Sequence, residues 1–138
     1  MTSIARLAPF ALALLRIVAG ALFLEHGLIK LIGFPPGAPP GQIPFDAVTQ
    51  WALPGAQMWI GAVIETATGT MLILGLFTRL AAFIAAGEMA VAYWQFHFPQ
   101  GFYPAGNNGE PAVLFCFVFL YIFVAGPGAL SADGPSKK

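Results

Sequence analysis

Four long apolar segments, separated by connections rich in turn-forming residues, constrain this chain more than any other feature. A membrane-spanning helix needs about 20 mostly apolar residues to cross the roughly 30 Å hydrocarbon core of a bilayer. The segments at 9–32, 56–77, 80–98 and 111–130 meet this requirement. Only 9% of the residues are charged and 58% are hydrophobic, so polar groups cannot cover a water-facing surface. The sequence therefore predicts an all-α membrane protein, a single domain over 1–138 folded as an antiparallel bundle of four transmembrane helices.

The basic residues predict how the spans are oriented, because cytoplasmic loops carry the excess of lysine and arginine. One side of the predicted bundle has only Lys30 near its edge, and the other side holds the remaining basic residues outside the spans. These are Arg6, Arg79, Lys137 and Lys138. We therefore expect cytoplasmic termini and a tight cytoplasmic turn at Thr78–Arg79. The longer connections at 33–55 and 99–110 are expected to face outward.

The composition also excludes several kinds of partner and cofactor. The formal net charge is zero and there is no basic run, so no nucleic-acid partner is expected. The single cysteine, Cys116, excludes an intramolecular disulfide and a CxxC redox pair. Two histidines and one cysteine are too few for a structural zinc site or an Fe–S cluster within one chain. The sequence predicts no metal site and no tightly bound cofactor.

Ionisable residues inside the predicted spans are the first pointer to function, since a charge at the bilayer centre costs about 2.5–3.5 kcal/mol on translocon scales. Such residues should face the bundle interior and form pairs. On the first span Arg16, His26 and Lys30 lie within about 80° of one another. Three carboxylates in the spans face two permanent cations, so at least one of Glu65 and Glu88 is expected to be protonated. We predict that Arg16 pairs with one of these two, with a purely structural tie between helices as the alternative.

Three ordered motifs then give the chain a family resemblance. They are RIVAGALFLEHGLIKLIGF (16–34), ETATGTMLILGLFTRLAA (65–82) and AYWQFHFPQGFYPAGNNGEPAVLFCFVFLY (92–121). Over nearly its whole length the sequence resembles the DoxX family of small bacterial membrane proteins. Thr68 and Asn108 depart from the glycines commoner there, in packing or turn positions. The resemblance implies a four-helix inner-membrane subunit, sometimes tied to quinone-linked oxidoreductases; the namesakes are a terminal quinol oxidase subunit and a thiosulfate:quinone oxidoreductase.

A quinone-linked redox subunit is therefore our first functional hypothesis, since quinone reduction needs a protonatable group beside the head group and an aromatic wall. The predicted catalytic residues are Glu25, His26, Lys30, Glu65 and Glu88. The predicted substrate contacts are Arg16, Tyr93, Trp94, His97, Asn107 and Glu110. His26 or Glu65 would donate the proton, and Lys30 would stabilise the developing quinol anion. Electrons would come from a partner or a reducing substrate, because the chain offers no ligands for flavin, copper or Fe–S.

Two other classes of function stay open. A non-enzymatic scaffold would dock a soluble or membrane oxidoreductase through the outward loops. Its contact residues would be Asp46, Asn107, Asn108 and Glu110. A small-solute transporter would also use the central carboxylates, but the chain has no inverted repeat or broken helix, so a homodimer would be needed to form a path. A haem ligated by His26 and His97 from two helices is the least favoured cofactor.

Overall fold

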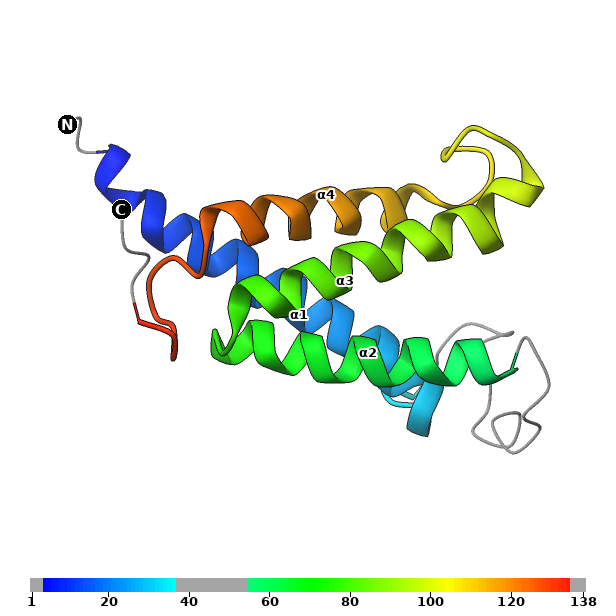
Figure 1. Cartoon of the computed structure of the whole chain (residues 1–138), viewed down its shortest axis with the longest axis horizontal. Helices are drawn as coiled ribbons and strands as arrows, with labels where there is room; N and C mark the ends of the chain where they lie inside the picture. Colours follow the sequence, from blue (N-terminus) through cyan, green and yellow to red (C-terminus); the bar gives the residue numbers. More distant parts are fainter. Residues whose placement is uncertain (1–3, 37–54, 135–138) are drawn as a thin grey trace.

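The computed structural model describes residues 4–36 and 55–134, which contain helices and turns and no strand. The elements are η1 (Ile4–Leu7), α1 (Ala8–Ile32), α2 (Gly55–Leu74), α3 (Thr78–Ala92), η3 (Tyr93–His97), η4 (Phe98–Gln100) and α4 (Glu110–Ala125). Successive α-helices run in opposite directions along the long axis (Figure 1). The all-helical class is thereby confirmed, whereas the predicted contact residue Asp46 lies outside the described residues.

Several helices end at other residues than predicted, and glycine or proline stands at two of these ends. The turn between α2 and α3 occupies residues 75–77, not Thr78–Arg79, because Gly75 and Phe77 take left-handed backbone angles (φ 67° and 46°). The last helix stops at Ala125 instead of continuing to residue 130, because Pro127 cannot donate a helical hydrogen bond. The third predicted span, 80–98, changes from α-helix to the π-helical turn η3 at Tyr93.

Two helical segments, Ile4–Ile32 and Gln57–Leu74, are long and apolar enough to cross a membrane. The helix Glu110–Ala125 is apolar but shorter. The length and composition of the described helices thus support two spans directly. That all four helices cross the bilayer stays a prediction.

Close contact between α1 and α2 depends on glycine. A Cβ added at Gly27 would lie 2.3 Å from Thr66 Oγ1, and one added at Gly20 would lie 2.9 Å from Leu72 Cβ. Small residues at a membrane helix interface let two backbones approach this closely. These two contacts also fix the antiparallel register, which sets Gly20 opposite Leu72 and Gly27 opposite Thr66.

The other half of the fold is the pair α3–α4, where alanines of α3 meet large side chains of α4. The fully buried residues of this interface include Ala81, Ala82, Ala85, Phe119 and Ile122. In Figure 1 the pairs α1–α2 and α3–α4 meet near the α2–α3 turn and diverge toward the opposite end. We call the end at the α2–α3 turn, where the helix axes lie closer together, the dense end.

Arg16 belongs to the dense end, and its predicted ion pair with Glu65 or Glu88 is wrong. The side chain is fully buried and donates only to backbone carbonyl oxygens among the described residues. Its acceptors are the carbonyls of Leu72, Ile73, Pro127, Ala129 and Leu130. On α2 the first of these acceptors lies about 10 Å along the axis from Glu65. Arg16 lies too far along α1 from Glu65 and Glu88 to pair with them. It is instead a structural tie between segments of the fold, as the alternative prediction held.

Asp133, which follows α4, caps the start of α3. Its two carboxylate oxygens accept hydrogen bonds from the backbone nitrogens of Phe77 (2.8 Å) and Thr78 (2.7 Å). Partial burial raises the pKa of Asp133, but the hydrogen bonds from Thr78 and Phe77 and the charge of Arg16 outweigh that effect and hold this pKa below its ordinary value. The segment after α4 thus fastens the beginning of α1 and both ends of the α2–α3 turn.

Candidate functional site

A cavity of about 690 Å³ lies between the helices at the diverging end of the molecule. All four helices contribute to its wall, which is mostly apolar. Its ionisable lining residues are His26, Lys30, Glu65, Glu88 and His97, and its uncharged polar ones are Gln57, Gln95 and Asn108. Small-molecule sites have this character: an apolar cleft of about 300–1,000 Å³ with a few convergent polar groups.

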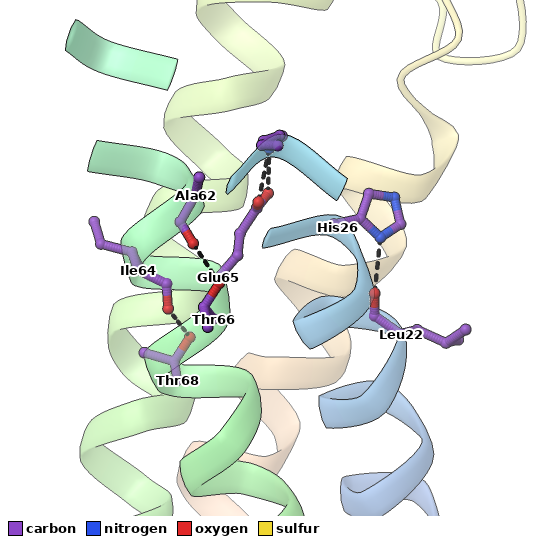
Figure 2. Close-up of polar contacts among 8 residues, drawn as sticks. Leu22, His26, Ala62, Ile64, Glu65, Thr66 and Thr68 are labelled. Carbon is purple, nitrogen blue, oxygen red and sulfur yellow. Dashed lines mark hydrogen bonds and ion pairs between the residues drawn. The ribbon is translucent and has the colours of Figure 1, made fainter. Parts of the chain in front are cut away.

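The strongest polar contact in the wall is the ion pair between Lys30 and Glu65. The Lys30 Nζ atom donates to both carboxylate oxygens, at 2.6 and 2.7 Å. The Glu65 side chain is only 2% exposed and the Lys30 side chain 20%. Figure 2 shows Glu65 reaching from α2 toward α1, with dashed lines to its partner. The contact of Gly27 with Thr66 brings the helices close enough for this pair, so both Glu65 oxygens are occupied.

Glu88 reaches the same region from α3. Its Oε1 lies 2.9 Å from the point where a Cβ would stand on Gly61, so the missing side chain there makes room for the carboxylate. Its Oε2 is buried and has no hydrogen-bond partner among the described residues. Glu65 and Lys30 are the charged groups that act on it electrostatically. Lys30 donates to Glu65 and not to Glu88, so the Glu88 carboxylate is costly to keep ionised in apolar surroundings.

His26 lies on the exposed side of α1, and an aromatic cluster joins α1 to α4 beside it. Its Nδ1 is 2.8 Å from the Leu22 carbonyl one turn earlier (Figure 2). A carbonyl oxygen only accepts, so Nδ1 carries a hydrogen and donates it to this carbonyl. The ring meets Phe115 edge-on at 5.9 Å, and Phe115 contacts Phe23 at 5.7 Å.

His97 is positioned by the loop between η4 and α4. Its Nδ1 lies 3.0 Å from the Asn107 carbonyl, so Nδ1 is the protonated nitrogen here too. Asn107 is 1% exposed; its amide donates to the Gly101 carbonyl and its side-chain oxygen accepts from the Gly109 nitrogen. The Tyr93 ring stacks near His97 at 6.3 Å. Asn107 and Tyr93 therefore shape the loop that holds His97.

The cavity brings together a definite part of the predicted site. His26, Lys30, Glu65, Glu88 and His97 all line it. The other predicted residues do not line it: these are Arg16, Glu25, Tyr93, Trp94, Asn107 and Glu110. The aromatic wall is built instead by phenylalanines, Phe23, Phe96 and Phe115.

Several lining residues escaped sequence reasoning although a helical spacing marks them. Counting back from Glu65 in steps of four along α2 reaches Gly61 and then Gln57, which share its face. Counting forward from Glu88 by seven reaches Gln95 in the same way. Among the described residues, no three histidine, cysteine, aspartate or glutamate side chains are grouped so that they could hold a metal ion.

Comparison with known proteins places the chain among relatives of similar size. It is 38% identical over 136 residues to an uncharacterized protein of Haemophilus influenzae, covering 96% of each chain. It is 28% identical to the inner membrane protein YphA of Escherichia coli, covering 91% of this chain and 89% of the relative. No solved structure is significantly similar. The sequence profile of the DoxX family matches residues 11–98. Because that match spans well over half of its length, the chain belongs to the DoxX family, and it is a membrane protein.

Proposed function

We propose that this protein is a quinone-binding subunit of the bacterial inner membrane, with all four helices crossing the bilayer and both termini in the cytoplasm. The observation that carries the proposal is a buried carboxylate oxygen, Glu88 Oε2, which has no hydrogen-bond partner within 4–36 and 55–134 and lies beside the Lys30–Glu65 ion pair in the wall of an apolar cavity. A quinone suits this site because its ring needs apolar walls, while its carbonyl oxygens need donors and then protons.

The chemistry requires two electrons and two protons for each quinone reduced to a quinol. The electrons come from a partner oxidoreductase carrying a reduced flavin, haem or Fe–S centre, since the sequence predicts no tightly bound cofactor in this chain. Glu88, protonated, donates to one quinone carbonyl oxygen and delivers a proton as the charge develops. Lys30 lies beside it and stabilises the developing anion. His26, which is exposed and lines the cavity, passes two protons from solvent: one to the second carbonyl oxygen of the quinone and one that restores Glu88.

Glu88 takes the role that the sequence assigned to Glu65 or His26. Both oxygens of Glu65 accept from Lys30, so neither oxygen of that carboxylate is free to contact a ligand. Glu88 has an oxygen free to act on a ligand. The proposal thus separates one carboxylate that fixes the ammonium from one that exchanges the proton.

The test is a titration of the purified protein with a short-chain quinone, following tryptophan fluorescence. Trp59 stands on α2 between two lining residues, so a bound quinone should quench it. Glu88→Ala removes a hydrogen bond to the ligand and should weaken binding roughly tenfold, the equivalent of about 1.4 kcal/mol. Glu88→Gln keeps a donor, so it should retain binding and lose proton uptake on reduction.

The matched control is Glu25→Gln, which changes a carboxylate at the same end of the molecule that does not line the cavity. It should bind as the unmodified protein does. Saturable quenching that only the Glu88→Ala variant weakens supports the proposal. Quenching that is linear and equal in all variants means partition into detergent, and it would remove the quinone assignment.

A docking subunit without enzymatic function is favoured by one observation. The loop before α4 exposes two aromatic rings, Phe102 (64%) and Tyr103 (75%). Under that function, Phe102→Ala with Tyr103→Ala should release a partner oxidoreductase from the membrane, while Glu88→Ala leaves the complex intact. The reverse pattern, with partner retained and quinone binding lost only at Glu88, favours the quinone-binding subunit.

A further inference from the structure

We propose that the ligand carries a long alkyl tail and reaches the cavity from the lipid, through a gap between α2 and α3 beside Gly87. The inference rests on the proposed quinone function and deepens it, because it selects a lipid-tailed quinone over a water-soluble one. In this arrangement the head lies near Lys30 and Glu88, and the tail leaves between the two helices.

The first support is the shape of the α2–α3 pair. The two helices meet at their turn and diverge toward the cavity end (Figure 1). Several residues line the cavity and are also open to the surface on this side, which marks a mouth. Three of them flank Gly87 or face α3 from α2: Ile60 (52% exposed), Ile84 (40%) and Val91 (55%). Gln57 and Gln95, farther along the two helices, are exposed lining residues too. Because the three side chains nearest Gly87 are aliphatic, this part of the mouth is suited to a hydrocarbon chain.

Two glycines line the cavity and differ in the space around them. Gly87 lines the cavity and is exposed, and a Cβ added there would meet no atom within 4 Å. Gly61, facing it from α2, is different, since a Cβ there would lie 2.9 Å from Glu88 Oε1. The space therefore runs from open surface at Gly87 to the carboxylate at Gly61. We therefore place the tail of the ligand at the open mouth beside Gly87 and its polar head beside Glu88.

The opposite side of the cavity, between α1 and α4, is filled by aromatic rings. Phe23 meets Phe119 at 4.8 Å and Phe115 at 5.7 Å, and Phe115 stacks on Phe119 at 5.5 Å. His26 is exposed there, but its ring rests against Phe115. A tail therefore has its path on the α2–α3 side, while the α1–α4 side presents a polar group and packed rings.

The experiment compares two quinones with the same head, one without a tail and one with a ten-carbon chain, in unmodified protein and in Gly87→Leu. The leucine side chain enters the mouth without touching the head site. Ala67→Leu is the matched control, because it adds the same bulk to an exposed position of α2 that does not line the cavity. Melting temperature and particle size by light scattering are measured on each protein.

We expect the tailed quinone to bind unmodified protein and Ala67→Leu at least tenfold more tightly than the tailless one. In Gly87→Leu that advantage should disappear, while the affinity for the tailless quinone stays within about twofold. If Gly87→Leu is unstable, Ile84→Trp narrows the same mouth from a different position and should give the same loss.

Other outcomes overturn the inference in distinguishable ways. Saturable binding of both quinones, with the tail advantage intact in Gly87→Leu and Ile84→Trp, removes the α2–α3 path and leaves the quinone function standing. Absence of saturable binding for either quinone in unmodified protein removes the function and the path together. A Gly87→Leu protein that changes its oligomeric state shows that a second copy of the chain covers this gap, which excludes the tail.

Discussion

Replacing Arg16 with methionine isolates the contribution of the carbonyl-binding guanidinium. Methionine keeps most of the side-chain volume and removes every donor. Arg16 is 0% exposed and its hydrogen bonds to Pro127 and Leu130 are 2.9 and 2.7 Å long. A hydrogen bond from a charged group contributes about 1.5–3 kcal/mol, but the contributions do not add, because some of the freed carbonyls can bind water. We expect Arg16→Met to lower the free energy of unfolding by about 3–5 kcal/mol, roughly the contribution of two such hydrogen bonds.

The assay is denaturant unfolding in detergent, followed by circular dichroism, together with limited proteolysis. Without Arg16 the segment 126–133 should become cleavable while the helices remain folded. Arg79→Met is the control, because Arg79 also donates to two carbonyls, those of Phe123 and Val124, but is exposed. It should lose about 1 kcal/mol or less. Equal losses for the two variants, or a loss under about 0.5 kcal/mol for Arg16→Met, would refute the reasoning.

Three further predictions concern other contacts. The pKa of Asp133 is lower in the folded protein than its value of about 3.9 in the unfolded chain, so the cap stabilises the fold fully above that pH, and this stabilisation is lost as the pH falls through the folded pKa. Asp133→Asn should abolish this part of the dependence of melting temperature on pH. Gly27→Ala should cost about 1–3 kcal/mol, since its Cβ would lie 2.3 Å from the nearest atom of α2, and Gly87→Ala should be close to neutral in the same thermal melts. Lys30→Met should cost about 3–5 kcal/mol by leaving Glu65 buried without its cation, and adding Glu65→Gln should restore most of that loss; additive losses in this double-mutant cycle would contradict the ion pair.

The number and order of the helices could be predicted because each is one uninterrupted apolar segment. Their ends could not be predicted equally well, since a backbone angle decides them. At the α2–α3 turn, Phe77 adopts a left-handed conformation that its side chain does not favour, and Asp133 holds the next helix from far along the chain. The sequence around the turn does not predict that capping contact.

The site was predictable in composition and less so in pairing. A long connection between α1 and α2 leaves their register open, so depth along α1 could not tell whether Arg16 or Lys30 reaches Glu65. Glycine contacts decide it in favour of Lys30. That Glu65 and Glu88 lie close together could be predicted from the sequence, because a short turn joins their helices and the two residues are nearly the same number of residues away from it. That signal concerns a local hairpin, whereas the α1–α2 register depends on backbone contacts that no spacing encodes.

The fastening of the dense end by residues 126–133 has a consequence for biogenesis. The ribosome synthesises α1 and α2 before this segment, so in the topology that we propose the nascent chain holds Arg16 inside the membrane without its carbonyl partners at Pro127 and Leu130. The insertion machinery or water must shelter that charge in the meantime. Pairing of α1 with α2 can precede translation of this segment. The start of α3 stays without its cap until Asp133 has emerged and accepts hydrogen bonds from Phe77 and Thr78. Released chains that end just before and just after these residues should therefore separate a loosely inserted form from a locked one.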